Sequence, residues 1–352
     1  MTYLIITRTD WEEPPRARHQ LARELAKTHN VIFVSINKNG NPRIQTNSPQ
    51  KNITLITPYW FLDGKYIYRI PILNEVYQYW LYSKLKKNAN CRVINFDPSA
   101  TLLHKFFDDV VYFCNDDFTS IRRAKSLVTK LYFHLSQRII AKNARFCTAV
   151  SEYLKDQLSL HTDSSHLILT AAEQLNISPK YINSNNSTIN AVYVGWISKI
   201  NKEWILSLSQ KKNIVIQLIG PYEANNFKEL IEKENIHFLG QKTGEELVNF
   251  LEKADVCLAP YIIGRDTEEV YTMPNKFWLY LNYGHPIVTC EIKRLYSLPK
   301  GFVYQAKNEN EFTNAVIKAH SENSENSFLE RLSFIKENNW GSRVNQIINL
   351  YK

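Results

Sequence analysis

Short apolar runs rich in β-branched residues alternate along the chain with longer amphipathic segments. In the first half, such runs predict strands at residues 3–7, 31–36, 53–57, 92–96, 110–113 and 146–150. Between the first two, Leu21, Ala22, Leu25 and Ala26 recur at a helical spacing within residues 17–28. Strands that alternate with helices in this way are typical of βαβ units, so the pattern predicts a parallel sheet.

The same alternation restarts after a polar stretch at residues 184–188, which a weaker strand at 167–170 precedes. Strands are predicted at 191–194, 214–219, 237–239, 256–260 and 286–290, and helices at 227–234, 244–254 and 275–283, with others from 203 and from 309 onward. A chain of 352 residues exceeds what one core usually organises. We therefore expect two Rossmann-like, doubly wound α/β domains, residues 1–183 and 189–330.

Composition narrows the range of partners. Hydrophobic residues make up 44% of the chain and charged residues 22%, as in ordinary globular proteins. The net charge of +9 favours anionic partners such as nucleotide phosphates, acidic lipids or nucleic acid. Basic residues are spread along the chain without a nucleic-acid motif, so we expect no nucleic-acid partner. The five cysteines stand singly, without metal-ligand spacing, and are interpreted as reduced core residues.

The hydrophobic pattern also bears on location. The apolar run at the N-terminus is too short for a signal segment, and no stretch of about 18 apolar residues occurs, so we expect a cytoplasmic protein whose membrane contact, if any, is peripheral. Residues 65–87 are dense in aromatic and basic side chains. Such a segment suits either the inner-leaflet interface of a membrane or a Tyr-rich core helix, and both interpretations stay open.

Two glycines and a lysine are the most specific candidates for chemistry. Gly195 and Gly220 each end a predicted strand, where the missing Cβ lets a ligand approach the backbone amides. Pro274-Asn275-Lys276 opens a helix, so free amides and a lysine meet at the positive helix end, as in a pyrophosphate site. Tight turns and a solvated lysine are the alternative interpretations.

Several short motifs follow one another between Val194 and Val288. They are Val194-Gly195, Gly220-Pro221, Phe238-Leu239-Gly240, Ala254-Asp255-Val256 with Pro260, and Pro274, Lys276, Tyr280, Leu281, Gly284, Pro286, Ile287 and Val288. In order and spacing, this set resembles the C-terminal domain of GT-B glycosyltransferases of the group 1 type. The resemblance implies a GT-B fold with two domains that face a cleft, and a terminal segment, residues 331–352, that crosses back onto the N-terminal domain.

The resemblance also implies a nucleotide-sugar site, in which Lys276 neutralises the leaving pyrophosphate without a metal. Its implied residues are Gly195, Trp196, Ser198, Lys199, Pro221, Tyr222, Gln241, Tyr271, Met273, Pro274, Asn275 and Lys276. Many relatives carry two glutamates eight residues apart, the second of which holds the ribose. Here Tyr271 and Leu279 occupy these two positions.

The N-terminal half is similar to the acceptor domains of polysaccharide and cell-surface glycan enzymes. After the first strand, Arg16, Arg18 and His19 begin a helix, where cations oppose the helix dipole, which favours contact with an anionic acceptor or the donor phosphates. Asp116 and Asp117 follow a buried strand, and either could be the general base or a helix cap. Asp10 is the rival base.

We therefore expect a metal-independent glycosyltransferase that needs no cofactor. It would move a sugar from a nucleoside diphosphate sugar, UDP before GDP, to a glycan or lipid-linked glycan in cell-surface polysaccharide synthesis. A sugar-nucleotide epimerase and an inactive, membrane-associated partner protein of the same fold are the alternatives. An epimerase would require a donor pocket richer in acid and base groups.

Overall fold

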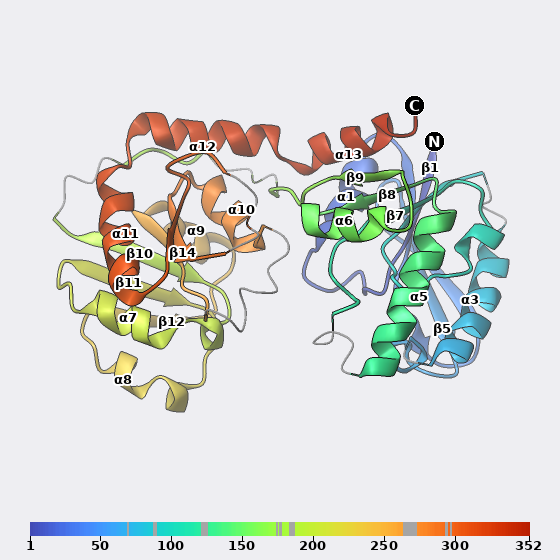
Figure 1. Cartoon of the computed structure of the whole chain (residues 1–352), viewed down its shortest axis with the longest axis horizontal. Helices are drawn as coiled ribbons and strands as arrows, with labels where there is room; N and C mark the ends of the chain where they lie inside the picture. Colours follow the sequence, from blue (N-terminus) through green and yellow to red (C-terminus); the bar gives the residue numbers. More distant parts are fainter. Residues whose placement is uncertain are drawn as a thin grey trace. The chain divides into compact units, whose positions relative to one another are not determined.

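The computed structural model describes residues 1–352 apart from 69, 87–89, 121–125, 174, 176–177, 183–186, 263–272, 293–294 and 296–297. The chain divides into two compact units (Figure 1). Unit 1 is Met1–Thr170 with Trp340–Lys352, and unit 2 is Ala171–Asn339. The first division thus precedes the expected boundary at 184–188, and residues 331–339 group with unit 2 instead of with the terminal segment.

The sheet of unit 1 has the strand order β3-β5-β2-β1-β6-β7-β8-β9. Its strands are β1 (Thr2–Ile6), β2 (Asn30–Val34), β3 (Lys38–Asn39), β4 (Arg43–Gln50), β5 (Ile53–Trp60), β6 (Arg92–Asn95), β7 (Val110–Cys114), β8 (Phe146–Ala149) and β9 (Ser165–Leu167). The strands along this path pair in parallel, and β4 adds an antiparallel partner to β5. The six strongest apolar runs of the first half are confirmed as strands.

Helices lie on both faces of this sheet. They are α1 (Ala17–Leu25), α2 (Gly64–Ile67), α3 (Pro71–Leu85), α5 (Leu127–Asn143), α6 (Glu152–Ser159) and α13 (Trp340–Asn349). Leu4 and Ile6 of β1 share a core with Tyr77 of α3, whereas Phe33 of β2 stacks on His19 of α1. Because neighbouring side chains of a strand point to opposite faces, the sheet separates these two layers.

Unit 2 has the strand order β12-β11-β10-β13-β14-β15, with every pair parallel. The strands are β10 (Ile189–Val194), β11 (Ile214–Ile219), β12 (Ile236–Gly240), β13 (Val256–Ala259), β14 (Ile287–Cys290) and β15 (Val303–Ala306). The helices are α7 (Lys202–Ser209), α8 (Lys228–Ile231), α9 (Gly244–Glu252), α10 (Asn275–Asn282), α11 (Glu309–Ser321) and α12 (Glu325–Glu337). Both expected doubly wound sheets are confirmed.

The strand order of each unit places its ligand-binding edge. In unit 1, β2 and β5 lie on one side of β1 and β6 lies on the other; in unit 2, β11 and β12 lie on one side of β10 and β13 lies on the other. The direction of winding therefore reverses between β1 and β6 and between β10 and β13. In sheets of this type, ligands bind outside the carboxyl ends of the strands at such a reversal. The segments that follow these four strands are therefore the places to look for function.

The structure bears on three predictions about buried residues and membrane contact. All five cysteines are buried and free, as interpreted from their spacing. Residues 65–87 form most of α2 and α3, whose inner side chains Tyr77 and Tyr82 lie in the core while Ile72, Val76 and Tyr79 are exposed. Among the described residues, every helix is too short or too polar to span a bilayer.

Candidate functional site

Two glycine turns meet at the carboxyl ends of β10 and β11 in unit 2. Gly195 and Gly220 have φ values of 139° and 145°, which favour glycine. The Gly195 amide donates to the carbonyl of Ile219 over 2.9 Å, and a Cβ on Gly220 would lie 1.9 Å from the Gly195 carbonyl oxygen. Only glycine fits at Gly220, so the two turns hold each other in place.

Lys276 lies directly beside this turn. Its Nζ is 3.9 Å from the centre of the Tyr193 ring and 5.0 Å from that of Tyr261. A Cβ on Gly195 would come within 3.1 Å of Nζ, so the missing side chain makes the space that the ammonium occupies. Burial, and secondly the charge of Lys199, lower the pKa of Lys276 to about 7. Desolvation disfavours the charged form, and an anion bound here would reverse the effect.

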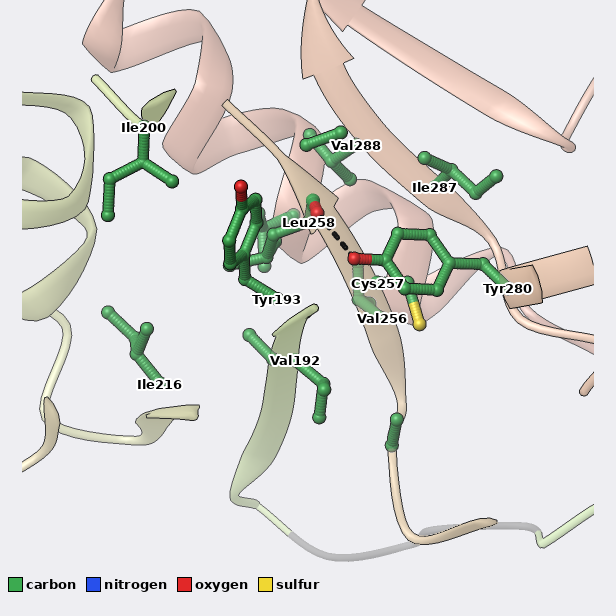
Figure 2. Packing of buried hydrophobic residues seen from close by; sticks show 14 of the residues in the cluster. Val192, Tyr193, Ile200, Ile216, Val256, Cys257, Leu258, Tyr280, Ile287 and Val288 are labelled. Atoms are coloured by element: carbon green, nitrogen blue, oxygen red, sulfur yellow. Dashed lines mark hydrogen bonds between the residues drawn. The ribbon is translucent and has the colours of Figure 1, made fainter. Parts of the chain in front are cut away.

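The backbone of α10 is fixed to the sheet through Tyr280. Its hydroxyl accepts from the amide of Val194 over 2.8 Å and donates to the carbonyl of Leu258 over 3.1 Å. Figure 2 shows this ring beside β13, with the hydroxyl directed at Leu258. Tyr280 thereby joins the ends of β10 and β13 to the helix that carries Lys276, and it sets the lysine at the winding reversal.

The other residues of the implied donor site differ in their exposure. Trp196, Ser198 and Lys199 follow β10 and are exposed, and Asn275 and Gln241 are exposed too, so these side chains are accessible to a ligand. Tyr222, next to Pro221, packs on Phe238 with ring centres 4.7 Å apart. Met273 is buried in the core, and Pro274 is the N-cap residue of α10. Leu279 packs against the core, and Tyr271 lies outside the described residues.

The sequence motif groups Gly284 with Lys276, but Gly284 has a role in packing. Its φ is 74°, and a Cβ there would lie 2.4 Å from the ring of Phe328 on α12. Its carbonyl accepts from Nε of the buried Arg331 over 2.7 Å. Gly284 therefore lets α12 pack closely on the chain after α10.

Unit 1 contains a cavity of about 530 Å³ at the carboxyl ends of its central strands. Arg8 and Thr9 after β1 line it, together with Phe96 and Pro98 after β6, and the remaining lining is Glu13, Arg16, Arg18, Ile36, Lys65, Tyr68, Asn115, Asp116, Phe118, Ser126, Thr129 and Phe133. Four cationic side chains face two carboxylates, an excess that suits an anionic ligand.

Two arginines in this cavity have different surroundings. The guanidinium of Arg8 lies 3.8 Å from the centre of the Tyr68 ring and 3.9 Å from a carboxylate oxygen of Asp97. Arg18 is buried, and its Nε has no hydrogen-bond partner among the described residues. Burial, then the charge of Arg16, lower the pKa of Arg18 to about 10. A buried guanidinium that lacks a partner at Nε is suited to bind a phosphate or carboxylate.

The three candidate bases have different environments. Asp117 is buried and accepts from the amide and hydroxyl of Thr119 over 2.9 and 2.6 Å, so its carboxylate closes a turn. The Asp10 carboxylate pairs with Lys38 over 3.1 Å and does not line the cavity. Asp116 does line the cavity, near the charge of Arg18. Among the three, Asp116 has the position that a base acting on a ligand there requires.

His19 has a structural role. It is fully buried, its Nδ1 accepts from the amide of Arg16 over 3.1 Å, and its Nε2 bonds the carbonyl of Asp10 over 3.0 Å. Burial lowers the pKa of His19, which favours the neutral ring that these two bonds require. His19 therefore shapes the turn before α1, and, contrary to the expectation, its ring nitrogens are not available to a ligand.

Sequence reasoning missed Arg8, Lys65 and Asn115 as cavity residues. Arg8 and Asn115 closely follow β1 and β7, so the expectation that ligand contacts come just after strands could have found them. Lys65 is in α2, within the segment singled out for its aromatic and basic residues, and nothing in that pattern indicates that it faces a cavity.

Comparisons with known proteins agree with this arrangement. Residues 194–322 match the family model described as glycosyl transferases group 1. The chain is 22% identical to the protein named "Putative teichuronic acid biosynthesis glycosyltransferase TuaH" of Bacillus subtilis (strain 168), across 98% of this chain and 96% of that one.

Solved structures share the whole fold. The structure described as "Trehalose-6-phosphate from E. coli bound with UDP-2-fluoro glucose" aligns with a TM-score of 0.69 at 10% identity, over 99% of this chain and 98% of that one. The apo lipopolysaccharide outer core galactosyltransferase WaaB aligns with a TM-score of 0.66 at 12% identity, over 100% of both chains. The chain therefore has the fold of GT-B glycosyltransferases, is similar to the group 1 type over residues 194–322, and is related to enzymes of cell-surface glycan synthesis.

Proposed function

We propose that the chain transfers a sugar from a nucleoside diphosphate sugar to a glycan or lipid-linked glycan during cell-surface polysaccharide synthesis. The observation that carries this proposal is the half-buried ammonium of Lys276, placed between the Gly195 turn and the start of α10. Within the described residues no carboxylate pairs with Lys276. The site thus holds a cation and free helix amides ready for an anion.

This arrangement suits the leaving group of glycosyl transfer. When the bond between the sugar and the diphosphate breaks, negative charge builds up on the departing phosphate oxygen. A fixed ammonium stabilises that charge without reorganisation, and more effectively in a desolvated site than in water. Lys276 would thereby supply the charge that a divalent ion supplies in other enzymes, and we propose transfer that does not depend on a metal.

For the base of the donor we propose uridine before guanosine. Tyr222 follows β11, is exposed and packs on Phe238 of β12, so it offers an aromatic surface on which a base can stack. The similar E. coli structure is bound with UDP-2-fluoro glucose, which supports the same choice.

On the acceptor side, we propose that Arg8 and Arg18 bind an acceptor that carries a phosphate or carboxylate. Asp116 would take the proton of the acceptor hydroxyl, whose oxygen then replaces the diphosphate at the anomeric carbon. Because lipid-linked acceptors of this kind are anionic, the cavity charges agree with a cytoplasmic enzyme that works peripherally at the inner membrane.

A thermal-shift screen with UDP, GDP, ADP and their glucose conjugates tests the donor site. UDP should raise the melting temperature most, and Lys276→Ala should lower UDP affinity about 10- to 100-fold, since a hydrogen bond to a charged group contributes about 1.5–3 kcal/mol. Lys228→Ala, an exposed lysine of α8, is the matched control. Equal affinity in both variants would refute the assignment of Lys276.

Product analysis tests the reaction. Incubation with donor and acceptor should give a glycosylated acceptor and UDP at a rate that EDTA leaves unchanged. A sugar epimer formed from donor alone would instead identify an epimerase. Absence of both nucleotide binding and turnover would indicate an inactive partner protein.

A further inference from the structure

The two neighbouring helices α3 and α5 of unit 1 expose an unusual number of large apolar side chains. On α5 these are Leu127, Val128, Leu131, Leu135 and Ile139, with Leu127 76% exposed. On α3 they are Ile72, Val76 and Tyr79. Together they are eight of the twenty exposed large apolar residues in the described parts of the chain. Scattered apolar residues need no explanation, but a concentration on two elements indicates an interaction surface.

The α5 residues form one face of the helix. Leu127, Leu131, Leu135 and Ile139 recur every four residues, which places them along the same side. The buried residues Phe133, Ser136, Ile140 and Ala141 point elsewhere around the helix. Because α5 already buries a separate face against the unit, its outward aliphatic face is not needed for the fold.

Cationic side chains are interleaved with the aliphatic ones on this outward face. Arg138 and Lys142 of α5 are exposed, and the helix sequence from Leu127 to Asn143 contains no aspartate or glutamate. At 100° per residue, Arg138 and Lys142 fall between the leucines of the stripe. An exposed helix that combines leucines with cations and lacks acids is suited to an anionic surface.

The exposed face of α3 lies next to that of α5. Asn74 of α3 donates to the hydroxyl of Tyr132 of α5 over 2.8 Å, and Figure 1 shows the two helices side by side. Tyr77 of α3 is part of the core beneath. Ile72, Val76 and Tyr79 are spaced by four and three residues on the side of α3 that the core does not use.

We propose that the outward faces of α3 and α5, here named the α3/α5 surface, dock unit 1 on a bilayer that contains anionic lipid. Aliphatic side chains would enter the interface between headgroups and acyl chains, while Arg138 and Lys142 contact lipid phosphates, as in interfacial amphipathic helices. A protein partner would have to supply acidic groups at matching positions, whereas an anionic membrane provides negative charge everywhere on its surface.

The other side of α5, at its N-terminal end, borders the cavity of unit 1. Ser126, the N-cap residue of α5, and Thr129 both line that cavity. Docking through α5 would therefore bring the cavity close to the lipid headgroups, where a lipid-linked acceptor carries its phosphate. The inference extends the proposed peripheral location but is independent of the donor site, so vesicle binding and UDP binding can fail separately.

Vesicle flotation of the full-length protein tests the proposal, with vesicles of phosphatidylcholine and phosphatidylglycerol in equal parts compared with pure phosphatidylcholine. We expect binding to the mixed vesicles that weakens as salt is raised. The double variant Arg138→Gln/Lys142→Gln should lower the partition coefficient roughly tenfold or more, on the basis of the attraction of one basic residue to an anionic leaflet. Lys211→Gln/Lys212→Gln, an exposed pair in unit 2, is the control of equal charge change.

The apolar contribution is tested with Leu131→Gln/Leu135→Gln, against Leu329→Gln on α12 as an exposed control. Glutamine is a good helix former, and the melting temperature and circular dichroism of each variant check that the fold is retained. Vesicle binding should fall in the α5 variant alone. The proposal would be overturned if the wild-type protein does not bind the mixed vesicles, or if the α5 variants bind them as tightly as the wild type does. The proposal would also be overturned if the wild-type protein is a dimer that does not bind vesicles and the leucine variant is a monomer. The α3/α5 surface would then join two copies of the chain.

Discussion

Binding of UDP should be coupled to uptake of a proton by Lys276. In the free protein, burial and the nearby Lys199 lower the pKa of this lysine to about 7 from its ordinary value of 10.5. A bound diphosphate supplies the negative charge that the site lacks, so it should raise the pKa toward the ordinary range. Lys276 is thus partly neutral before binding near pH 7 and charged afterwards.

The size and sign of the effect follow from the two pKa values. At about pH 8, roughly a tenth of the free protein carries a charged Lys276, so each UDP should bring in about 0.9 proton. At about pH 6 the lysine is already charged, and uptake falls to about 0.1 proton. The contribution of Lys276 to affinity therefore decreases about tenfold between these pH values, which corresponds to about 1.4 kcal/mol.

Isothermal titration calorimetry in two buffers that differ in ionisation enthalpy measures the number of protons directly. The terminal phosphate of UDP, with a pKa of about 6, is fully ionised near pH 8, so it adds little to the count there. Lys276→Met should abolish the uptake together with most of the affinity. Lys276→Arg, which stays charged, should bind with an affinity that is nearly flat above neutral pH.

The coupling argument has a clear refutation. If wild type and Lys276→Met take up the same number of protons near pH 8, the proton belongs to another group. The affinity for UDP should weaken as the pH rises past the pKa of Lys276 in the free protein. If it does not, this ammonium has no role in binding diphosphate.

Further predictions concern packing and the cavity of unit 1. Gly284→Ala should lower the free energy of unfolding by about 2–4 kcal/mol because of its left-handed φ and the ring of Phe328, with UDP affinity of the folded fraction unchanged in calorimetry. Asp116→Asn should reduce kcat while leaving the melting temperature near that of wild type, whereas Asp117→Asn should lower the melting temperature. Arg18→Leu should raise KM for a phosphorylated acceptor in transfer assays without loss of stability, because it removes a buried charge that lacks a partner at Nε.

The periodicity of hydrophobic residues was sufficient to predict most strands of both sheets. It did not predict β4, the exposed antiparallel strand of unit 1, or the helix α5. Buried parallel strands such as β1 and β7 are continuous apolar runs, which few other elements produce. The residues of β4 are polar and exposed, so its pairing with β5 leaves no hydrophobic signal. In α5 the outward face is as apolar as the inward one, and the usual amphipathic pattern is lost. The same feature that hid this helix indicates the α3/α5 surface.

The sequence groups the residues around Gly195 and Lys276 into one set, but it does not reveal their separate environments. The sequence marks both Gly195 and Gly220, yet only the packed turns show that Gly220 must be glycine to clear the Gly195 carbonyl. Lys276 and Gly284 belong to one motif, but they lie at opposite ends of α10, Lys276 beside the Gly195 turn and Gly284 against Phe328 of α12. Short-range spacing cannot distinguish these environments, because each is set by a partner far away in the sequence.

The two sheets lead to the same physical conclusion from different residues. In unit 1, Arg18 is buried at the winding reversal with an unpartnered Nε, and in unit 2 Lys276 is half-buried at the corresponding place without a carboxylate partner among the described residues. A desolvated cation destabilises the ligand-free fold, and an aliphatic side chain of similar size would remove that penalty. Positions that retain such a charge are therefore best explained by a ligand that neutralises it. This reasoning supports the proposal that both units bind anions, a donor diphosphate in unit 2 and an acidic acceptor in unit 1.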